Sequence, residues 1–246
     1  MPIIYLSPST QDWNPYITGS GSEEQNMNLL ADRLEIYLRS NAIRWDRNSP
    51  DMTAGSSVRE ANRHYYDLYL ALHSNASGEG AAGKNRGIIV FYYPGSTQGQ
   101  RAAELIAQEL RKIYPLPAKV TTRPTTTLGE IRLSRFPAVL AEIGYHDNVL
   151  DAQWLEGHWD DIAQQLARAL TRFFGLPYIA PIQPMEGEVQ VSWGTLNLRS
   201  YPSPTGTILA NLPDEAEVTI YGAWEGWYVV QWKDKVGYAA SAYIDT

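Results

Sequence analysis

The amino-acid sequence predicts an α/β fold, with a mostly parallel sheet flanked by helices, followed by a small C-terminal all-β barrel. Two observations lead to this prediction. Short apolar runs alternate with segments of helical periodicity up to about residue 175, and from residue 188 onward only short alternating strand patterns remain. The 246 residues exceed one typical domain of roughly 100–200 residues, which agrees with one full domain and a smaller second one.

The elements of the first part follow in order. Ile3 to Leu6 is an apolar run that predicts the first strand, and a helix follows from about Ser22, a plausible N-cap. Apolar residues recur at helical spacing from Met27 to Leu38. The sequence then predicts strands over residues 67–73, 87–93 and 137–142, and helices over residues 98–114 and 159–174. Gly175, directly after the last helix, is a typical C-terminal stop.

A change of composition marks the domain boundary. The stretch after Gly175 contains Pro177, Pro181 and Pro184, which favours an extended linker. We therefore expect a catalytic-type domain over residues 1–176, a linker over residues 177–187 and a β-rich domain over residues 188–246.

Composition excludes several functional classes. The 27 acidic and 20 basic side chains give a net charge of -7, which argues against nucleic acid as a partner. No run of roughly 18 apolar residues exists to cross a membrane. The first residues lack the basic and long apolar regions of a secretory signal. The absence of cysteine excludes disulfides and thiolate chemistry, so metal or acid–base chemistry has to come from four histidines and the carboxylates.

Polar side chains follow three of the predicted strands. Gln11 follows the first strand, His73 and Asn75 end the second, and Glu142 with His146 ends the strand that begins at Pro137. The carboxyl ends of parallel strands open on one edge of a sheet, where ligands bind. Glu23, in the first turn of the first helix, is expected at the same edge. The sequence therefore predicts that Glu23, His73 and Glu142 gather in one site.

These residues also carry a family resemblance. The segment Leu72-His73-Ser74-Asn75-Ala76, the segment Glu142-Ile143-Gly144-Tyr145 with Asn148 after it, Arg59 with Asn62, and the helix-opening Glu23 resemble zinc-dependent N-acetylmuramoyl-L-alanine amidases of the amidase-3 type. The resemblance covers residues 1 to about 175. Enzymes of this type cut the amide bond between the lactyl group of muramic acid and the first L-alanine of the peptidoglycan stem peptide.

The resemblance implies a role for each matching residue. His73 and Glu23 correspond to zinc ligands, with Glu23 preferred to Glu24 because it stands eight positions before the small residue Ala31. Glu142 corresponds to the catalytic glutamate, which takes a proton from water and delivers it to the leaving amine while Zn²⁺ polarises the scissile carbonyl. Asn75 is an expected substrate-binding residue.

The sequence departs from the family pattern at one ligand position. The family carries a ligating histidine after the first strand, where this chain has Ser9 and Thr10. Three interpretations are open: Gln11 or Asp12 supplies an oxygen, His146 takes the place of the missing histidine, or the site is free of metal. The last of these predicts a catalytically inactive, amidase-like protein that binds the cell wall. Hydrolysis of a related muropeptide amide or of a peptide bond is a further alternative.

The C-terminal part resembles a bacterial SH3-type domain. The resemblance rests on the segment from Leu196 to Ser203, on Gly226-Trp227-Tyr228 and on Val236-Gly237-Tyr238. Exposed aromatic residues of such domains can bind cell-wall peptide or glycan, and Trp227 is the expected substrate-binding residue here. Together the two resemblances imply a peptidoglycan hydrolase that acts in the bacterial cell wall, outside the cell or attached to the wall, with peptidoglycan as its partner and no membrane.

Overall fold

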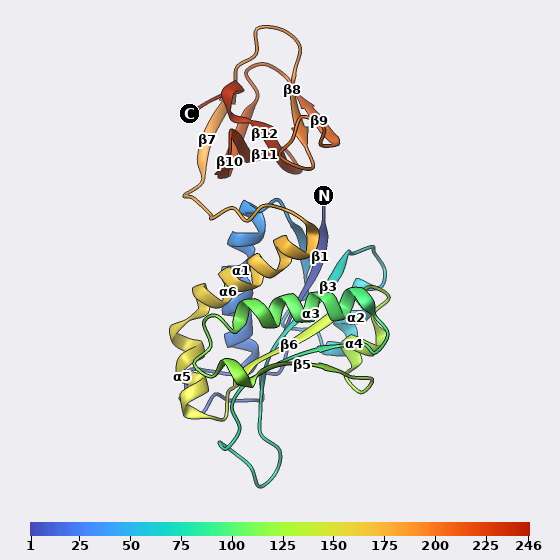
Figure 1. Ribbon diagram of the computed structural model, residues 1–246, viewed down its shortest axis with the longest axis vertical. Helices are drawn as coiled ribbons and strands as arrows, with labels where there is room; N and C mark the ends of the chain where they lie inside the picture. The colour runs from blue at the N-terminus through green and yellow to red at the C-terminus, as the bar shows by residue number, and fades with distance from the viewer. The chain divides into compact units, whose positions relative to one another are not determined.

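The computed structural model describes residues 1–246, which fold into two compact units. One unit comprises Ile3–Leu34 and Trp45–Phe174, and the other comprises Met1–Pro2, Glu35–Arg44 and Gly175–Thr246. The structure contains no helix whose length and apolar character suit a membrane span. We describe the two units separately, beginning with the larger (Figure 1).

The larger unit contains a six-stranded sheet with the strand order β2-β1-β3-β6-β4-β5. Its strands are β1 (Ile3–Pro8), β2 (Arg44–Arg47), β3 (Leu68–Asn75), β4 (Ile88–Tyr92), β5 (Val120–Pro124) and β6 (Ala138–Tyr145). The central strand β3 is buried on both faces along nearly its whole length, and it pairs in parallel with β1 and β6. The predicted mixed α/β class with a mainly parallel sheet is confirmed.

Two strands run opposite to the central strands of the sheet. β4 pairs antiparallel with β6 and parallel with its other neighbour β5, so β4 and β5 both run opposite to β1, β3 and β6. A parallel connection between strands requires a crossover of a dozen or more residues, usually with a helix. Residues 76–87, which connect β3 to β4, contain no helix. The direction of β4 therefore depends on this connection, and the residues of β4 itself do not indicate it.

Helices cover both faces of the sheet. They are α1 (Glu23–Ser40), α2 (Ala54–Ala61), α3 (Thr97–Leu110), α4 (Gly129–Leu133), α5 (Val149–Gly157) and α6 (Trp159–Phe174), with a short 3₁₀ turn at Pro117–Lys119. α3 packs on β4, β5, β6 and α6, whereas α2 packs against α4. Side chains of α2 and α4 share a buried cluster with Tyr5, Tyr69 and Leu140 of the sheet. Because side chains alternate along a strand, this cluster defines one face of the sheet.

The start of α1 follows the local sequence signal. The Ser22 Oγ accepts a hydrogen bond from the Gln25 backbone N–H at 3.2 Å, and the Gln25 side-chain oxygen accepts one from the Ser22 N–H at 3.0 Å. This reciprocal pair is a capping box, which satisfies two donors that a helix terminus leaves without a partner. It confirms Ser22 as the N-cap and fixes Glu23 as the first residue of the helix.

Asp151 holds together the loops at the carboxyl end of β6. Its fully buried carboxylate accepts hydrogen bonds from the Arg86 side chain, the Tyr114 hydroxyl and the backbone N–H groups of Gly87 and Tyr145. We expect the substitution Asp151→Ala to lower the free energy of unfolding by about 3 kcal/mol, because it leaves buried donors and a partly buried arginine without their partner. Urea denaturation measures this change.

The exposed Asp161 of α6 supplies the control. The substitution Asp161→Ala removes only a helix N-terminal carboxylate and is expected to cost less than about 1 kcal/mol. Equal losses in the two variants would contradict a special role for Asp151.

The smaller unit contains an antiparallel sheet with the order β13-β7-β10-β11-β12-β8-β9. Its strands are β7 (Met185–Val189), β8 (Leu196–Arg199), β9 (Ile208–Leu212), β10 (Glu217–Trp224), β11 (Trp227–Trp232), β12 (Lys235–Ala240) and β13 (Ile244–Asp245), with a 3₁₀ turn at Ser241–Tyr243. Alternate residues such as Leu198, Val218 and Val230 form its core, as expected for a small all-β domain.

Candidate functional site

Strand register brings His73 and Glu142 together. The two residues are direct partners on the neighbouring parallel strands β3 and β6. Register partners point to the same face of a sheet, which here is the face that Tyr69 and Leu140 share with α2 and α4. Both strands end within three residues of these side chains. The predicted position at the carboxyl edge of the sheet therefore agrees with the structure.

Glu23 reaches the same place from the first turn of α1. Its side chain is buried, and its Oε1 lies 2.9 Å from Nδ1 of His73. Its Oε2 accepts a hydrogen bond from the Asn14 side-chain amide at 3.1 Å. The neighbouring Glu24 forms no hydrogen bond with His73, and its backbone carbonyl oxygen accepts a hydrogen bond from the Asn28 side chain within the helix. The capping box explains this difference, since it fixes which of the two glutamates faces the sheet.

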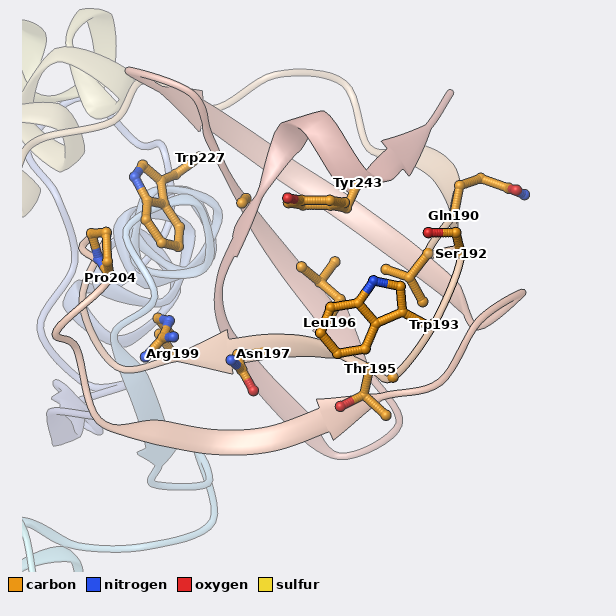
Figure 2. A pocket seen from close by; sticks show the side chains of 13 residues that line it. Gln190, Ser192, Trp193, Thr195, Leu196, Asn197, Arg199, Pro204, Trp227 and Tyr243 are labelled. Carbon is orange, nitrogen blue, oxygen red and sulfur yellow. The ribbon is translucent and has the colours of Figure 1, made fainter.

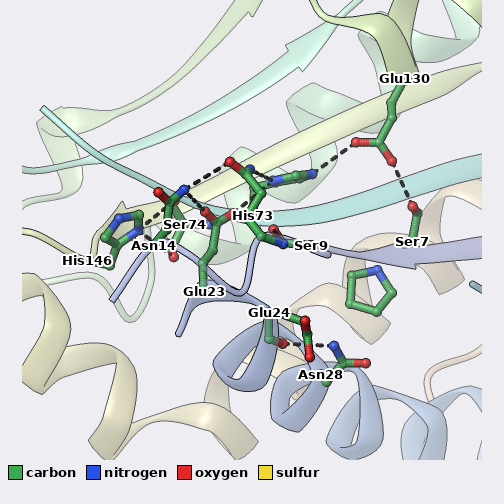
Figure 3. A network of polar contacts seen from close by, with 12 residues as sticks. Ser7, Ser9, Asn14, Glu23, Glu24, Asn28, His73, Ser74, Glu130 and His146 are labelled. Carbon is green, nitrogen blue, oxygen red and sulfur yellow. Dashed lines mark hydrogen bonds and ion pairs between the residues drawn. The ribbon is translucent and has the colours of Figure 1, made fainter. Parts of the chain in front are cut away.

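The second ring nitrogen of His73 contacts a residue that the sequence did not indicate. Glu130 of α4 is buried, and its Oε2 lies 3.0 Å from Nε2 of His73. Figure 3 shows the imidazole between the two carboxylates, with Glu23 at one end and Glu130 at the other. Glu130 lies 57 positions from His73 in the chain and carries no motif. The only signal that could have found it is its place on the short helix before the Pro137 strand.

Gln11 lies beside the same nitrogen as Glu23. Its side-chain Nε2 is 3.4 Å from Nδ1 of His73, and its Oε1 accepts a hydrogen bond from Asn14 at 2.9 Å. Asp12, the alternative oxygen donor, is exposed. Ser9 and Thr10 border the site, and together with Gln11 they line a cavity of about 400 Å³ whose wall includes His73 and Glu130.

His146 lies away from these three groups. Its Nδ1 is 2.9 Å from the Ser74 carbonyl oxygen and 3.0 Å from the Ser74 Oγ, and its ring stacks on Tyr16. The hydrogen bonds of its ring go to Ser74 and not to Glu23 or His73. The role of His146 as a third ligand stays a prediction.

The predicted substrate-binding residues lie in different units. Asn75 ends β3, and its carbonyl oxygen accepts a hydrogen bond from the His146 backbone N–H at 2.9 Å. Trp227 begins β11 in the smaller unit, where it borders a cavity of about 750 Å³ together with Trp193 and Tyr243. Figure 2 shows Trp227 toward one end of this cavity and Trp193 toward the other.

Burial and charge set the protonation of the site. Burial raises the pKa of Glu142 to about 7, the charges of Glu23 and Glu130 add to this rise, and the charge of His73 opposes it. Burial also disfavours the charged form of His73, but hydrogen bonds to Glu130 and Glu23 prevail and raise its pKa well above the usual value. For Glu23, burial would raise the pKa, but the hydrogen bond from His73 holds it below the usual value.

The donor set of the site fits zinc in part. Glutamate oxygen and histidine nitrogen are common zinc ligands, and Glu23 and His73 present both. Three buried carboxylates surround one imidazole, and Glu142 Oε2 has no hydrogen-bond partner, so a cation would compensate buried negative charge. No group of three or more His, Asp or Glu side chains is arranged to hold a metal ion, because Glu23 and Glu130 face opposite nitrogens of His73. A third ligand would have to be an uncharged oxygen.

The family of the chain follows from this fold and site taken with sequence comparison. Residues 6–172 match the family described as N-acetylmuramoyl-L-alanine amidase, and the chain belongs to this family and enzyme class. Residues 194–245 match the bacterial SH3 domain. No curated protein matches the chain significantly.

Solved structures of similar fold bear similar names. One is the N-acetylmuramoyl-L-alanine amidase AmiC2 of Nostoc punctiforme, with 17% identity and a TM-score of 0.61, which covers 71% of this chain and 97% of its own. Another is the catalytic domain of CwlV, an N-acetylmuramoyl-L-alanine amidase from Paenibacillus polymyxa, with 20% identity and a TM-score of 0.58, over 71% of this chain and 99% of its own. At these identities the likeness establishes the fold alone.

Proposed function

We propose that this protein hydrolyses the amide bond between N-acetylmuramic acid and L-alanine in peptidoglycan, with zinc as its metal and the SH3-type unit binding the cell wall. The observation that carries the proposal is the Glu142 carboxylate. It is buried beside His73, its Oε2 has no partner, and burial raises its pKa to about 7. A general base works best when its pKa lies near the working pH.

Glu23, His73 and the side-chain oxygen of Gln11 would hold the metal. Gln11 suits this role because its side-chain amide lies beside Nδ1 of His73. The oxygen and nitrogen of an amide are assigned from hydrogen bonding alone, so a rotation of the amide would turn its oxygen toward a metal ion at this place. A bound zinc ion supplies Lewis-acid polarisation of the scissile carbonyl and acidifies water.

The residues of the chain carry out the proton transfers. Glu142 accepts a proton from the attacking water, whose oxygen forms a bond to the carbonyl carbon of the lactyl group. The carbon–nitrogen bond then breaks, and Glu142 delivers the proton to the nitrogen that leaves as the amine of L-alanine. Burial of Glu142 keeps bulk water from competing for this proton.

Digestion of purified cell walls tests the proposal directly. Full-length protein supplied with zinc is expected to release new L-alanine amino termini, and the substitution His73→Ala is expected to abolish the release. The absence of new termini with the wild-type protein, or unchanged release by the His73 variant, would contradict the hydrolase function. Termini of another residue would instead identify a related muropeptide amide or a peptide bond as the substrate.

The rate is expected to fall on the acidic side of neutrality. Glu142 has to be ionised to accept a proton, and with a pKa of about 7 it becomes ionised as the pH rises through that value. A bound cation favours the ionised form further, so the acidic limb of kcat/KM should lie at or below pH 7. A pH–rate profile measures this limb. A limb clearly above pH 7 would contradict the assignment of Glu142 as the base.

A second candidate function is cell-wall binding without catalysis. The observation that favours it is the ligand position after β1, where Ser9 and Thr10 stand and no third His, Asp or Glu joins Glu23 and His73. Elemental analysis of protein purified without chelators separates the two candidates. One zinc ion per chain excludes the metal-free candidate, and no zinc together with no digestion of cell walls favours it.

The aromatic cavity of the smaller unit is proposed as the wall-binding site. Trp193 is 87% exposed and Tyr243 is 50% exposed, and both line the same cavity, so their aromatic surfaces are together available to a ligand. The substitution Trp193→Ala is expected to weaken binding to insoluble peptidoglycan about fivefold, since one aromatic stacking contact contributes on the order of 1 kcal/mol. A co-sedimentation assay measures the change.

The control for this prediction is Tyr65→Ala, which removes an aromatic residue that is 70% exposed in the larger unit and outside the cavity. Equal binding by both variants and the wild-type protein would place the wall-binding surface elsewhere.

A further inference from the structure

Glu130 is a buried carboxylate for which the proposed reaction has no use. It lies on the short helix α4, and its side chain is 4% exposed. Its Oε1 accepts hydrogen bonds from the Ser7 hydroxyl and the Tyr69 hydroxyl, both at 2.7 Å, and its Oε2 contacts Nε2 of His73 at 3.0 Å. Both oxygens are therefore engaged, by groups of β1 and β3 on one side and by the histidine on the other.

The contact with Glu130 determines which nitrogen of His73 could bind a metal ion. An ionised carboxylate accepts hydrogen bonds and does not donate them, so Nε2 has to carry a proton when it faces Glu130, and Nδ1 carries one toward Glu23 while no metal ion is bound. A metal ion held by Glu23 would displace the Nδ1 proton, whereas Glu130 keeps the proton on Nε2. The ring is then held with Nδ1 toward Glu23 and Gln11. A histidine that binds a metal through one nitrogen commonly donates its other N–H to a carboxylate, which fixes its tautomer and orientation.

We propose that Glu130 is a positioning residue of the hydrolase site: by accepting the Nε2 proton of His73, it keeps Nδ1 directed at Glu23 and Gln11. This inference rests on the proposed zinc-dependent function and deepens it. The Ser7 and Tyr69 hydroxyls in turn hold Glu130 in place, so the alignment of His73 depends on β1, β3 and α4 together.

An amide at position 130 cannot replace the carboxylate in this arrangement. If its oxygen faces His73, its NH₂ group faces two hydroxyls that now have to accept rather than donate. If its NH₂ group faces His73 instead, it favours the tautomer with the proton on Nδ1. The substitution Glu130→Gln therefore conserves size and burial but removes the preference for the correct nitrogen.

The first test is the spectrum of the His73 ring in the full chain. The wild-type protein is expected to give a slowly exchanging, downfield Nε2–H proton signal, as a buried N–H on a carboxylate does. In Glu130→Gln this signal should move upfield or vanish. The matched control is Glu109→Gln, since Glu109 of α3 is equally buried but pairs with Lys112 and with Arg172 of α6. An unchanged Nε2–H signal in Glu130→Gln would overturn the proposal.

The second test is zinc affinity, measured by titration with zinc chloride against a chromophoric chelator. Glu130→Gln is expected to weaken binding by roughly 10–100-fold, and Glu109→Gln by less than about twofold. Should Glu130→Gln fail to fold, Tyr69→Phe removes one hydrogen bond to Glu130 while keeping the packing, and it should shift both measurements in the same direction. Unchanged zinc affinity in a folded Glu130 variant would also overturn the proposal.

The two measurements separate this inference from the function on which it rests. If the wild-type protein binds no zinc and digests no cell walls, the proposed function fails, and the Nε2–H signal still decides whether Glu130 positions His73. If the wild-type protein binds zinc and Glu130→Gln binds it equally well, the function stands and the role of Glu130 fails.

Discussion

Replacement of Glu142 by glutamine is expected to lower kcat for the release of L-alanine amino termini by about 10²–10⁴-fold, which is the range for loss of a general acid–base group. Glutamine has nearly the same shape but cannot accept and return a proton. KM and zinc content should change little, because Glu142 forms no hydrogen bond to Glu23 or Gln11. Steady-state kinetics on solubilised peptidoglycan fragments separate kcat from KM.

The stability of the Glu142→Gln variant is a second, independent test of the role of Glu142. In the native protein Glu142 is half-buried, and its Oε2 is enclosed and has no hydrogen-bond partner. An unpaired buried carboxylate destabilises a fold, so a neutral amide in this position should leave the melting temperature unchanged or raise it. A loss of activity without a loss of stability would identify Glu142 as functional. Retention of more than a small fraction of the wild-type activity would contradict its role as the base.

Replacement of Glu23 by glutamine is expected to reduce zinc affinity by more than the roughly 10–100-fold that follows loss of an outer-shell partner. The amide lacks the negative charge that a divalent cation requires, and it also removes the carboxylate that faces Nδ1 of His73 at 2.9 Å. Measurement of zinc content and of zinc affinity by chelator competition tests this expectation.

The neighbouring glutamate supplies the matched control. Glu24→Gln makes the same chemical change one residue further along α1, where the half-buried side chain does not contact His73. Zinc affinity should remain within about twofold of the wild-type value, since a partly solvated carboxylate outside the ligand set contributes little at physiological ionic strength. A larger effect at Glu24 than at Glu23 would mean that the wrong glutamate has been assigned.

Much of the fold is predictable because its signals are local. The capping residue Ser22 and the apolar spacing of α1 lie within a few positions of each other, as do the apolar residues of β3. The strands that flank the site were therefore predicted close to their observed positions. The direction of β4 was not, because it depends on the path of residues 76–87 and on pairing with a strand some fifty positions away in the chain.

The residues of the candidate site were also predictable only in part. Glu23, His73 and Glu142 were predicted from their places at the ends of elements, and the register of β3 with β6 puts two of them side by side. His146 was expected to lie near them because it follows Glu142 closely in sequence. Its ring instead forms hydrogen bonds to Ser74, and nearness along the chain gives no information on this.

The sequence by itself determined the α/β and all-β parts of this protein, its amidase and SH3-type resemblances and the three acidic and histidine residues of the site. Only the tertiary structure shows that Glu130 and Gln11 lie beside His73 and that the ring of His146 contacts Ser74. Periodicity and capping depend on a few neighbouring residues. The partners of a buried imidazole instead depend on where a helix docks on a sheet, which involves residues fifty or more positions apart.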